Sequence, residues 1–468
     1  MQLFNTLTRY KEEFTPLTPG HVLFYHCGPT VYWTQHIGNL RGMTMGDLLR
    51  RSFEYLGYDV KHVRNYTDVG HLTSDSDTGE DKMEKGAKRE GKTPDEIAKK
   101  YIDIFEKDSK ALNLLEPTFK PRATQYIQQM IDMIATLLEK GCAYTTDLAV
   151  YFDVTKFDSY TNLSHQQMDK LMEGAGKADV SDPRKKHAAD FALWFFKAGV
   201  HSDALQYWTS PFQSLLVRDG VGFPGWHIEC SAMSKALLGN TLDIHFGGAE
   251  HIPVHNTNEI AQSEAANGVK FVNFWLHNEH LLVNDKKMAK SEGTVFSLAE
   301  IIDRGYDPLI LRYFFLQAHY RSKQNFTWDA LDGAKKALRE LREKVIAWKR
   351  DKNTVDCRGK RYTEQFIEAI SDDLNIPKAL GLVWEMTKAG ITNAEKLALL
   401  IDFDRVLGLG LSDWKQEEIP EEIMKLSKQR DELRSKNNFA ASDIVRDRIV
   451  ACGYTIEDTS QGTVVKKQ

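Results

Sequence analysis

The chain has 468 residues, and its composition, 42% hydrophobic and 27% charged, predicts a globular protein of two to four compact units. We expect a cytoplasmic protein without a membrane segment. No stretch resembles an export signal, no apolar run approaches the ~18 residues that span a bilayer, and five scattered cysteines argue against a disulfide framework. The net charge of −5 gives no general attraction to nucleic acid, so any such binding requires local basic surface.

The first seventy residues have the pattern of a strand, a helix and a second strand. HVLFYH (21–26) is a short apolar run of strand type, and apolar residues then recur at helical spacing from Leu40 to Leu56. A second strand is expected in DVKHVRNYTDV (59–69). This order predicts the start of a parallel α/β unit.

The middle of the chain alternates between helical and strand patterns. A densely charged stretch (74–96) predicts a solvated loop and helix, and helical spacing follows at about 97–115 and 124–140. AYTTDLAVYFDVTKFDSY (143–160) alternates like a hairpin and begins an excursion from the main sheet that ends in SDPRKKHAAD (181–190). Strands are expected again in TLDIHF and FVNFWLHNEHLLV. From about Trp328 the pattern is almost entirely helical, with polar breaks at 351–362 and 409–422.

The loop between the first strand and helix suits a bound phosphate. A helix start offers free N–H groups and the positive end of the helix dipole. His36 and Asn39 would stand there as hydrogen-bond donors, and Gly38 would let a flat group approach the backbone. An ordinary βα turn with a surface histidine is the alternative interpretation.

A second group of residues could bind a metal ion. His255 and Glu259 are four residues apart in a helical pattern, so both side chains share one face. With Cys27 and Cys230 they form a ligand set suited to Zn²⁺. No local CxxC pattern links the cysteines, and a salt-bridging His–Glu pair is the alternative.

Two lysines lie in a short loop that follows a strand. LLVNDKKMAKSEGTVFSL places Lys287 and Lys290 beside Ser291 and Gly293. Lysines on a glycine-bearing loop can neutralise charge on a transferring phosphoryl group. The alternative is a basic surface turn.

Together, HIGN (36–39) and KMAKS (287–291) resemble the paired signatures of class I aminoacyl-tRNA synthetases. The resemblance extends over essentially the whole chain to the cysteinyl-tRNA synthetase family. It is carried by LFNTLTRYKEEF, CGPTVY, VRNYTD, DFALW, GWHIECSAMS, HNTNEIAQSEA, HYRSKQNFTW and NNFAASDIVRDRIVACGYTIEDTSQGT, in that order.

The resemblance implies an α/β fold with a Rossmann-type catalytic domain that carries an insertion, followed by helical domains. The expected boundaries are 1–115 and 191–280 for the two halves of the catalytic domain, 116–190 for the connective insertion, 281–350 for the KMSKS loop and stem-contact region, 351–410 for the helical bundle, and 411–468 for a small C-terminal anticodon-binding domain.

The same resemblance implies ATP-dependent activation of L-cysteine and transfer to tRNA(Cys) by a monomer. One Zn²⁺ per chain would select the substrate thiolate, and Mg²⁺ would arrive with ATP. The implied metal ligands are Cys27, Cys230, His255 and Glu259. The implied ATP-binding residues are Thr30, His36, Gly38, Asn39, Gly248 and Lys290, of which His36, Asn39 and Lys290 also serve catalysis, supported by Lys287. Thr67, Trp226 and His227 would surround the amino acid.

Zinc also explains how the family would reject serine. An apolar pocket distinguishes such near-isosteric substrates by only about 10–200-fold. Zn²⁺ prefers soft sulfur, so we expect strong discrimination against serine without an editing domain.

Several positions depart from the family pattern. Asn39 stands where the family usually has histidine, and because an amide can still donate a hydrogen bond, we expect activity to survive. Asn256 and Thr257, which lie between the implied ligands His255 and Glu259, differ from the residues that the family usually has there. Phe246 and Glu250 stand where the family usually has glycine and aspartate, near the adenosine site.

The last helix pair of the chain is basic, which is common in solvated helices, and the resemblance favours contact with the anticodon end of tRNA. Its basic residues are Lys425, Lys428, Arg430, Arg434, Lys436, Arg446 and Arg448.

Two rival functions remain open from the sequence. One is the related cysteine ligase of mycothiol synthesis, which acylates an amino-sugar but typically lacks the unit that residues 415–468 resemble. The other is a degenerate regulatory paralogue, motivated by Asn39 and Asn256. Cys142, Cys357 and Cys452 have no assigned role and are expected to be structural.

Overall fold

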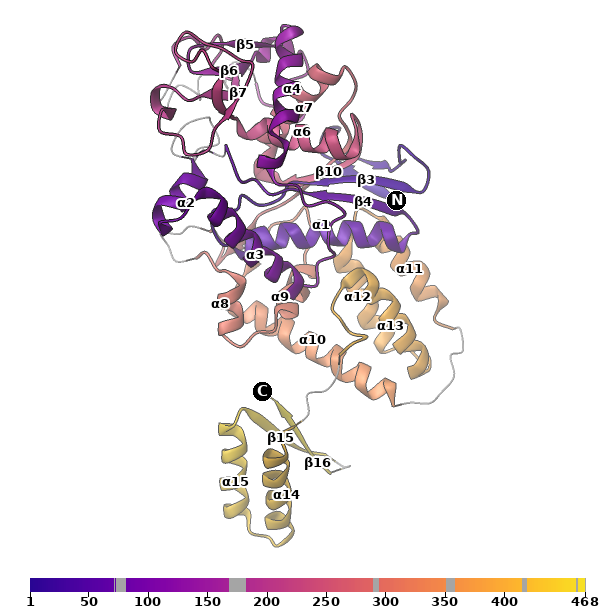
Figure 1. Ribbon diagram of the computed structural model, residues 1–468. Helices are drawn as coiled ribbons and strands as arrows, with labels where there is room; N and C mark the ends of the chain where they lie inside the picture. Colours follow the sequence, from indigo (N-terminus) through magenta and orange to yellow (C-terminus); the bar gives the residue numbers. More distant parts are fainter. Residues whose placement is uncertain are drawn as a thin grey trace. The chain divides into compact units, whose positions relative to one another are not determined.

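The computed structural model describes residues 1–70, 72, 81–167, 182–288, 294–350, 358–414, 419–459 and 462–467 (Figure 1). The chain forms two compact units, Met1–Ser412 and Asp413–Gln468, and the second begins close to the expected boundary at residue 411. Within these described ranges, no helix is both long and apolar enough to cross a membrane.

The centre of the first unit is a parallel sheet of four strands, in the order β11-β10-β3-β4. These strands are β3 (His21–His26), β4 (Asp59–Arg64), β10 (Leu242–Gly248) and β11 (Val272–Asn278). α1 (Ile37–Tyr55) connects β3 to β4 and covers one face, and α6 (Trp226–Leu238) and α7 (Thr257–Asn267) lie on the other (Figure 1). The strands are buried along most of their length because helices cover both faces of the sheet. The expected Rossmann-type α/β architecture is confirmed.

The strand order reverses between β3 and β10. From β3 the chain proceeds outward to β4, and from β10 it proceeds outward in the other direction to β11. The connections therefore leave a crevice at the carboxyl ends of β3 and β10, where ligands bind in open parallel sheets. Cys27 follows β3 directly, and its backbone N–H donates to the carbonyl of Phe246 on β10 at 3.0 Å.

The excursion from the main sheet is an antiparallel sheet of five strands, in the order β5-β6-β7-β9-β8. The strands are β5 (Ala143–Thr145), β6 (Ala149–Phe152), β7 (Phe191–Phe196), β8 (Trp208–Thr209) and β9 (Val221–Pro224). β5 and β6 form the hairpin expected from their alternating pattern. The expected boundary between residues 190 and 191 falls inside this sheet, because β6 on one side of it pairs with β7 on the other.

Helices and short strands complete the first unit. The helices are α2 (Lys82–Glu90), α3 (Pro94–Ala111), α4 (Ile127–Glu139), α8 (Leu298–Asp303), α9 (Pro308–Leu316), α10 (Trp328–Lys349), α11 (Lys360–Ser371), α12 (Ile376–Thr387) and α13 (Asn393–Leu407). The remaining strands are β1 (Gln2–Asn5), β2 (Tyr10–Glu13), β12 (Leu281–Val283), β13 (Lys286–Lys287) and β14 (Gln324–Phe326). One apolar core lies between the sheet, α1 and the helical region, and a second joins the sheet to the insertion.

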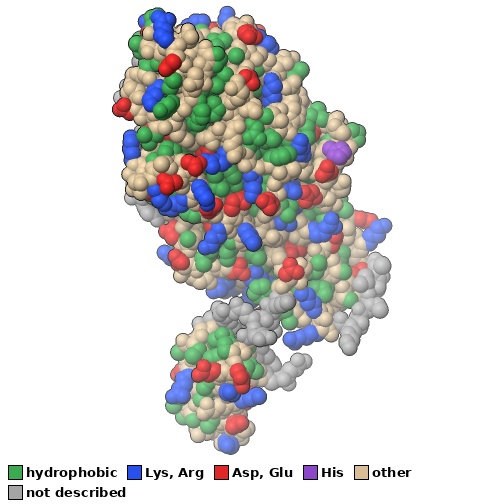
Figure 2. All heavy atoms as spheres, in the orientation of Figure 1, with side chains coloured by type: hydrophobic (Ala, Val, Ile, Leu, Met, Phe, Trp, Pro, Cys, Tyr) green, Lys and Arg blue, Asp and Glu red, His purple; other side chains and the backbone are tan. Residues whose placement is uncertain are grey.

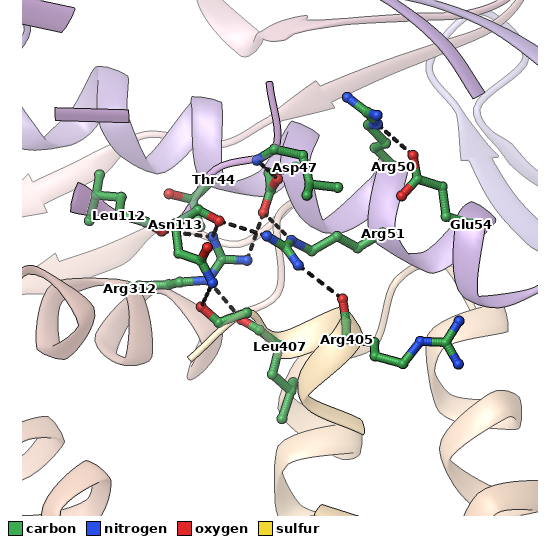
Figure 3. A network of polar contacts seen from close by, with 12 residues as sticks. Thr44, Asp47, Arg50, Arg51, Glu54, Leu112, Asn113, Arg312, Arg405 and Leu407 are labelled. Atoms are coloured by element: carbon green, nitrogen blue, oxygen red, sulfur yellow. Dashed lines mark hydrogen bonds and ion pairs between the residues drawn. The ribbon is translucent and has the colours of Figure 1, made fainter. Parts of the chain in front are cut away.

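A buried charge cluster ties α1 to the helical region (Figure 3). Asp47 on α1 accepts hydrogen bonds from Arg51 at 2.8 Å and from Arg312 on α9 at 2.7 Å. The two arginines also donate to backbone carbonyls at the carboxyl ends of α3 and α13, where the helix dipole favours positive charge. These carbonyls belong to Leu112, Asn113, Arg405 and Leu407.

The second unit packs a helix pair on a hairpin. It contains α14 (Glu421–Ser435), α15 (Phe439–Ala451), β15 (Tyr454–Thr459) and β16 (Gly462–Lys467). A small core of Ile423, Val445, Ile449 and Val465 holds it together. The β15–β16 hairpin was not expected from the sequence, which reads as almost entirely helical after Trp328.

Candidate active site and metal centre

A cavity of about 400 Å³ lies in the crevice between β3 and β10. The loop after β3, the start of α1, the carboxyl end of β10 and the loop after β12 all contribute to its wall. The predicted site residues that line it are Cys27, Thr30, His36, Gly38, Asn39, Thr67, Trp226, Cys230, Gly248, His255 and Lys287. Residues that are far apart in the sequence therefore share one cavity.

The start of α1 brings the two signatures together. His36 is the N-cap of the helix, and its ring Nδ1 accepts the backbone N–H of Asn39 at 3.2 Å. The glycine at 38 has no side chain, and any Cβ there would collide with the Met288 side chain and press on the His36 ring. The residue that approaches the backbone of Gly38 is therefore Met288, which directly follows Lys287 in the chain.

Four predicted metal ligands converge at one side of the cavity, where Cys27, Cys230 and His255 line the wall and Glu259 does not. Cys27 follows β3, Cys230 lies on α6, His255 lies in a π-helical turn before α7, and Glu259 lies in the first turn of α7. One donor atom from each lies within 4.8 Å of the other three, and all four side chains are buried. The Nε2 atom of His255 is 2.8 Å from Glu259, as expected for residues four apart on one helical face.

This donor set fits a zinc ion. Two sulfurs, an imidazole nitrogen and a carboxylate oxygen are ligands that Zn²⁺ accepts, and bonds of about 2.0–2.3 Å place tetrahedral ligand atoms roughly 3.3–3.8 Å apart. The Cys27 sulfur lies 3.9 Å from the nearer carboxylate oxygen of Glu259, close to that spacing. A salt-bridging pair alone would not require two buried cysteines beside it.

The electrostatics of the cluster favour a cation. The hydrogen bond with Cys230 raises the pKa of the Cys27 thiol, and the same bond, helped by His255, lowers the pKa of Cys230 to about 6. Burial opposes a charge on His255, but Glu259 and Cys230 outweigh it and raise the pKa of His255 to about 10. Burial also opposes a charge on Glu259, and His245 and His255 nevertheless hold the pKa of that carboxyl far below its usual range. At pH 7 a thiolate and a carboxylate are therefore available.

Residues behind the cluster orient Glu259. The Nε2 atom of His245 lies 2.8 Å from one carboxylate oxygen, and the Asn256 amide donates to the other at 3.0 Å. The side-chain amide oxygen of Asn256 in turn lies 3.0 Å from Nε2 of His277. Such outer partners fix the geometry of metal ligands. Sequence analysis missed His245 and His277, since neither stands at a recognisable spacing from the ligands.

Trp226 covers the metal site from the cavity side. Its ring stacks on His255 with centroids 4.3 Å apart and an angle of 19° between planes. His227 does not line the cavity and is 1% exposed, and its Nδ1 lies 3.0 Å from Nδ1 of His255. Thr67 is buried beside Asn65, whose amide donates to the threonine hydroxyl at 3.2 Å.

The other end of the cavity carries charges of both signs. Lys287 lines it from β13, and Nδ1 of His280 lies 3.7 Å from a carboxylate oxygen of Glu250. Phe246 is fully buried on β10 and packs edge-on against His26. Lys290, Ser291 and Gly293 lie outside the described residues, so the predicted role of Lys290 stays a prediction.

Comparison with known proteins gives a consistent result over the full chain. The family model for the class I (C) tRNA synthetase catalytic domain matches residues 13–336. The chain is 44% identical over 465 residues to cysteine–tRNA ligase 1 of Burkholderia lata, covering 99% of this chain and 96% of that protein. It is 42% identical over 488 residues to cysteine–tRNA ligase of Caldicellulosiruptor saccharolyticus, covering 100% of both. The solved methionyl-tRNA synthetase of Mycobacterium tuberculosis, in complex with methionyl-adenylate, shares the fold at 12% identity, with a TM-score of 0.56 over 83% of this chain and 88% of that one.

Proposed function

The chain belongs to the cysteine–tRNA ligase family of class I tRNA synthetases, and we propose that it activates L-cysteine with ATP and transfers the cysteinyl group to tRNA(Cys). The observation that carries this proposal is the convergence of Cys27, Cys230, His255 and Glu259 within 4.8 Å, the first three of which line a cavity shared with His36 and Asn39. The cluster that would select a thiol and the helix start that would bind phosphate thus adjoin the same cavity.

The four converging side chains would hold one Zn²⁺. When bound, the ion supplies a soft Lewis acid that favours a thiolate over the hydroxyl of serine. Trp226 and Thr67 would surround the cysteine side chain, and His227 would act through its contact with His255. We expect strong preference for cysteine over serine, because shape alone distinguishes near-isosteric substrates by only about 10–200-fold.

The start of α1 would bind the nucleotide. Free N–H groups and the helix dipole favour phosphate there, and Thr30, Gly38 and Gly248 line the same cavity. Because Nδ1 of His36 accepts the cap hydrogen bond, the tautomer with its proton on Nε2 would donate to a phosphate oxygen. The Asn39 amide can also donate, so the absence of the family's usual histidine at this position leaves placement of ATP intact.

The reaction needs positioning and charge stabilisation rather than a protein nucleophile. The substrate carboxylate attacks the α-phosphorus of ATP, which arrives with Mg²⁺, and pyrophosphate leaves with the electrons of the broken P–O bond. Lys287 and Lys290 would neutralise charge on the leaving phosphates. A ribose hydroxyl at the 3′ end of tRNA then attacks the cysteinyl carbonyl, and AMP leaves.

The second unit would contribute to tRNA binding. Six of the seven basic side chains on α14 and α15 are exposed, but Arg430 is buried and donates to both carboxylate oxygens of Asp458, at 2.8 and 2.7 Å. On the face drawn in Figure 2, Lys and Arg side chains are interspersed with Asp and Glu, so contacts with phosphates would be local.

We also propose that the enzyme acts as a cytoplasmic monomer, because the cavity is built from one chain and the described cysteines are unpaired.

An acceptor assay tests the proposal. Purified enzyme loaded with Zn²⁺ should catalyse cysteine-dependent exchange between ATP and pyrophosphate, and should then acylate tRNA(Cys) but not an amino-sugar. If the enzyme catalyses exchange and then acylates an amino-sugar but not tRNA(Cys), the tRNA proposal is wrong and the protein is a mycothiol-type ligase. Absence of exchange in zinc-loaded protein would instead favour a regulatory paralogue.

A further inference from the structure

A second lysine, from a different part of the chain, lines the catalytic cavity. Lys82 is the first residue of α2 and forms part of the cavity wall together with Lys287. Among the described residues that line the cavity, these two lysines are accompanied by no arginine. Sequence analysis assigned no role to Lys82, because the charged stretch around it resembles an ordinary solvated segment.

Lys82 lies on the amino-acid side of the cavity. Its Nζ atom is 5.9 Å from the centroid of the Trp226 ring, and that ring stacks on the metal ligand His255 at 4.3 Å. Lys287, by contrast, precedes Met288, which packs on Gly38 at the start of α1. The two lysines therefore serve different ends of the cavity, one beside the thiol-binding group and the other beside the phosphate-binding helix.

The backbone around Lys82 is well anchored. Asp81 caps α2 by accepting the N–H groups of Met83 at 2.7 Å and Glu84 at 3.1 Å. The Met83 side chain is fully buried, and the Glu84 carboxylate accepts the backbone N–H of Leu205 at 2.8 Å. A lysine on such a fixed helix start can hold its charge at a constant place, which is the requirement for orienting a substrate.

We propose that the Lys82 ammonium binds the α-carboxylate of the amino acid that the cavity holds by its sulfur. The inference rests on the proposed function and adds a substrate-contacting residue to it. With the sulfur at the Cys27–Cys230 wall under Trp226, the carboxylate needs a cation nearby, and Lys82 is the described lysine on that side. The contact keeps one carboxylate oxygen in place while the other attacks the α-phosphorus. Lys82 itself exchanges no proton and forms no bond in the step.

Comparison of two ligands tests this role without relying on activity. L-cysteine carries the carboxylate, and cysteamine has the same thiol and amine without it. In zinc-loaded full-length enzyme, Lys82→Met should weaken L-cysteine binding by roughly 10–100-fold, as loss of a charge-assisted hydrogen bond does, and cysteamine binding by less than about threefold. Lys82→Arg should recover part of the loss for L-cysteine. Isothermal titration calorimetry measures these affinities.

Lys85→Met is the matched control, since Lys85 is an exposed lysine on the same helix and does not line the cavity. It should leave both ligands unaffected. Equal weakening of both ligands by Lys82→Met, or no weakening of either, would overturn the proposal. Wild-type enzyme that binds L-cysteine without supporting pyrophosphate exchange would contradict the proposed function alone, and enzyme that binds neither ligand would contradict both.

Discussion

At the scale of single residues, the site depends on where each donor group stands in its element. Cys27 directly follows a buried strand and Glu259 occupies the first turn of a helix, so neither side chain can move far without moving a whole element. The π-helical turn before α7 carries His255 to within 2.8 Å of Glu259. The sequence predicted these residues as metal ligands, and the structure brings their donor atoms within 4.8 Å of one another. Their outer partner His245 was not, because its contact with Glu259 arises from the pairing of strands and helices.

Cys230→Ser tests the metal site at this scale. Loss of one thiolate should lower the affinity for Zn²⁺ by more than the roughly 10–100-fold that loss of an outer partner costs. Cysteine-dependent pyrophosphate exchange should fall with the metal content, which elemental analysis of the dialysed protein measures. Cys142→Ser serves as the control, because Cys142 is a free cysteine outside the cluster. Full metal content in Cys230→Ser would show that the cluster is not the metal site.

At the scale of elements, α1 connects the catalytic cavity to the helical region. Asn39 stands at its first turn, and Asp47 lies about 12 Å further along the helix at a rise of 1.5 Å per residue. Asp47 and its two arginines join α1 to α9 and to the carboxyl ends of α3 and α13 (Figure 3). Arg41, also fully buried on α1, donates to Gln324 at 3.0 Å and fixes the helix to β14. The position of α1 is thus set by charged contacts as well as by its apolar face.

Asp47→Asn should destabilise the first unit by about 3–5 kcal/mol, because it leaves two buried guanidinium groups without their anion. Burial opposes the charge on Asp47, but Arg312 and Arg51 outweigh it and hold the pKa of its carboxyl below the usual value. A depressed carboxyl pKa stabilises the fold above the unfolded-state value of ~3.9, and this contribution is lost as the pH falls through the folded-state pKa. The difference between variant and wild type should therefore shrink below about pH 4.

Urea unfolding followed by circular dichroism at several pH values measures this effect. Glu54→Gln is the control, since it makes the same acid-to-amide change on α1 in a partly exposed pair with Arg50, and it should cost at most about 1 kcal/mol. Equal destabilisation by both variants would contradict the importance assigned to the buried cluster.

At the scale of the whole molecule, the chain forms two units with separate cores, and the proposed function assigns the chemistry to the first and part of the tRNA binding to the second. The cavity lies within Met1–Ser412, whereas the exposed basic side chains of α14 and α15 belong to Asp413–Gln468. Activation of cysteine needs only the first unit, so changes on the second should affect the transfer step alone.

The double variant Lys428→Gln and Arg446→Gln in the full-length chain tests this division. Pyrophosphate exchange should stay within about twofold of wild type, while binding of tRNA(Cys) weakens and the slope of its affinity against salt concentration falls by about one per lost phosphate contact. Filter binding at several salt concentrations gives the slope. Lys99→Gln, which removes an exposed charge from α3, is the control. An unchanged slope in the double variant would exclude these two residues from the interface.

The sequence by itself determined the local parts of this protein. Strand and helix patterns predicted β3, α1, β4, β10 and the helical region, and the signatures predicted the four candidate ligands and the candidate phosphate-binding helix start. These follow from side-chain type and periodicity, which are local properties. The β15–β16 hairpin is also local, and its strand pattern was missed. The extent of the insertion sheet beyond residue 190 and the place of Lys82 beside Trp226 were decided by tertiary structure alone. The physical reason is that strand pairing and cavity walls join residues far apart in the chain, and no local pattern encodes which distant segments bury their faces against each other.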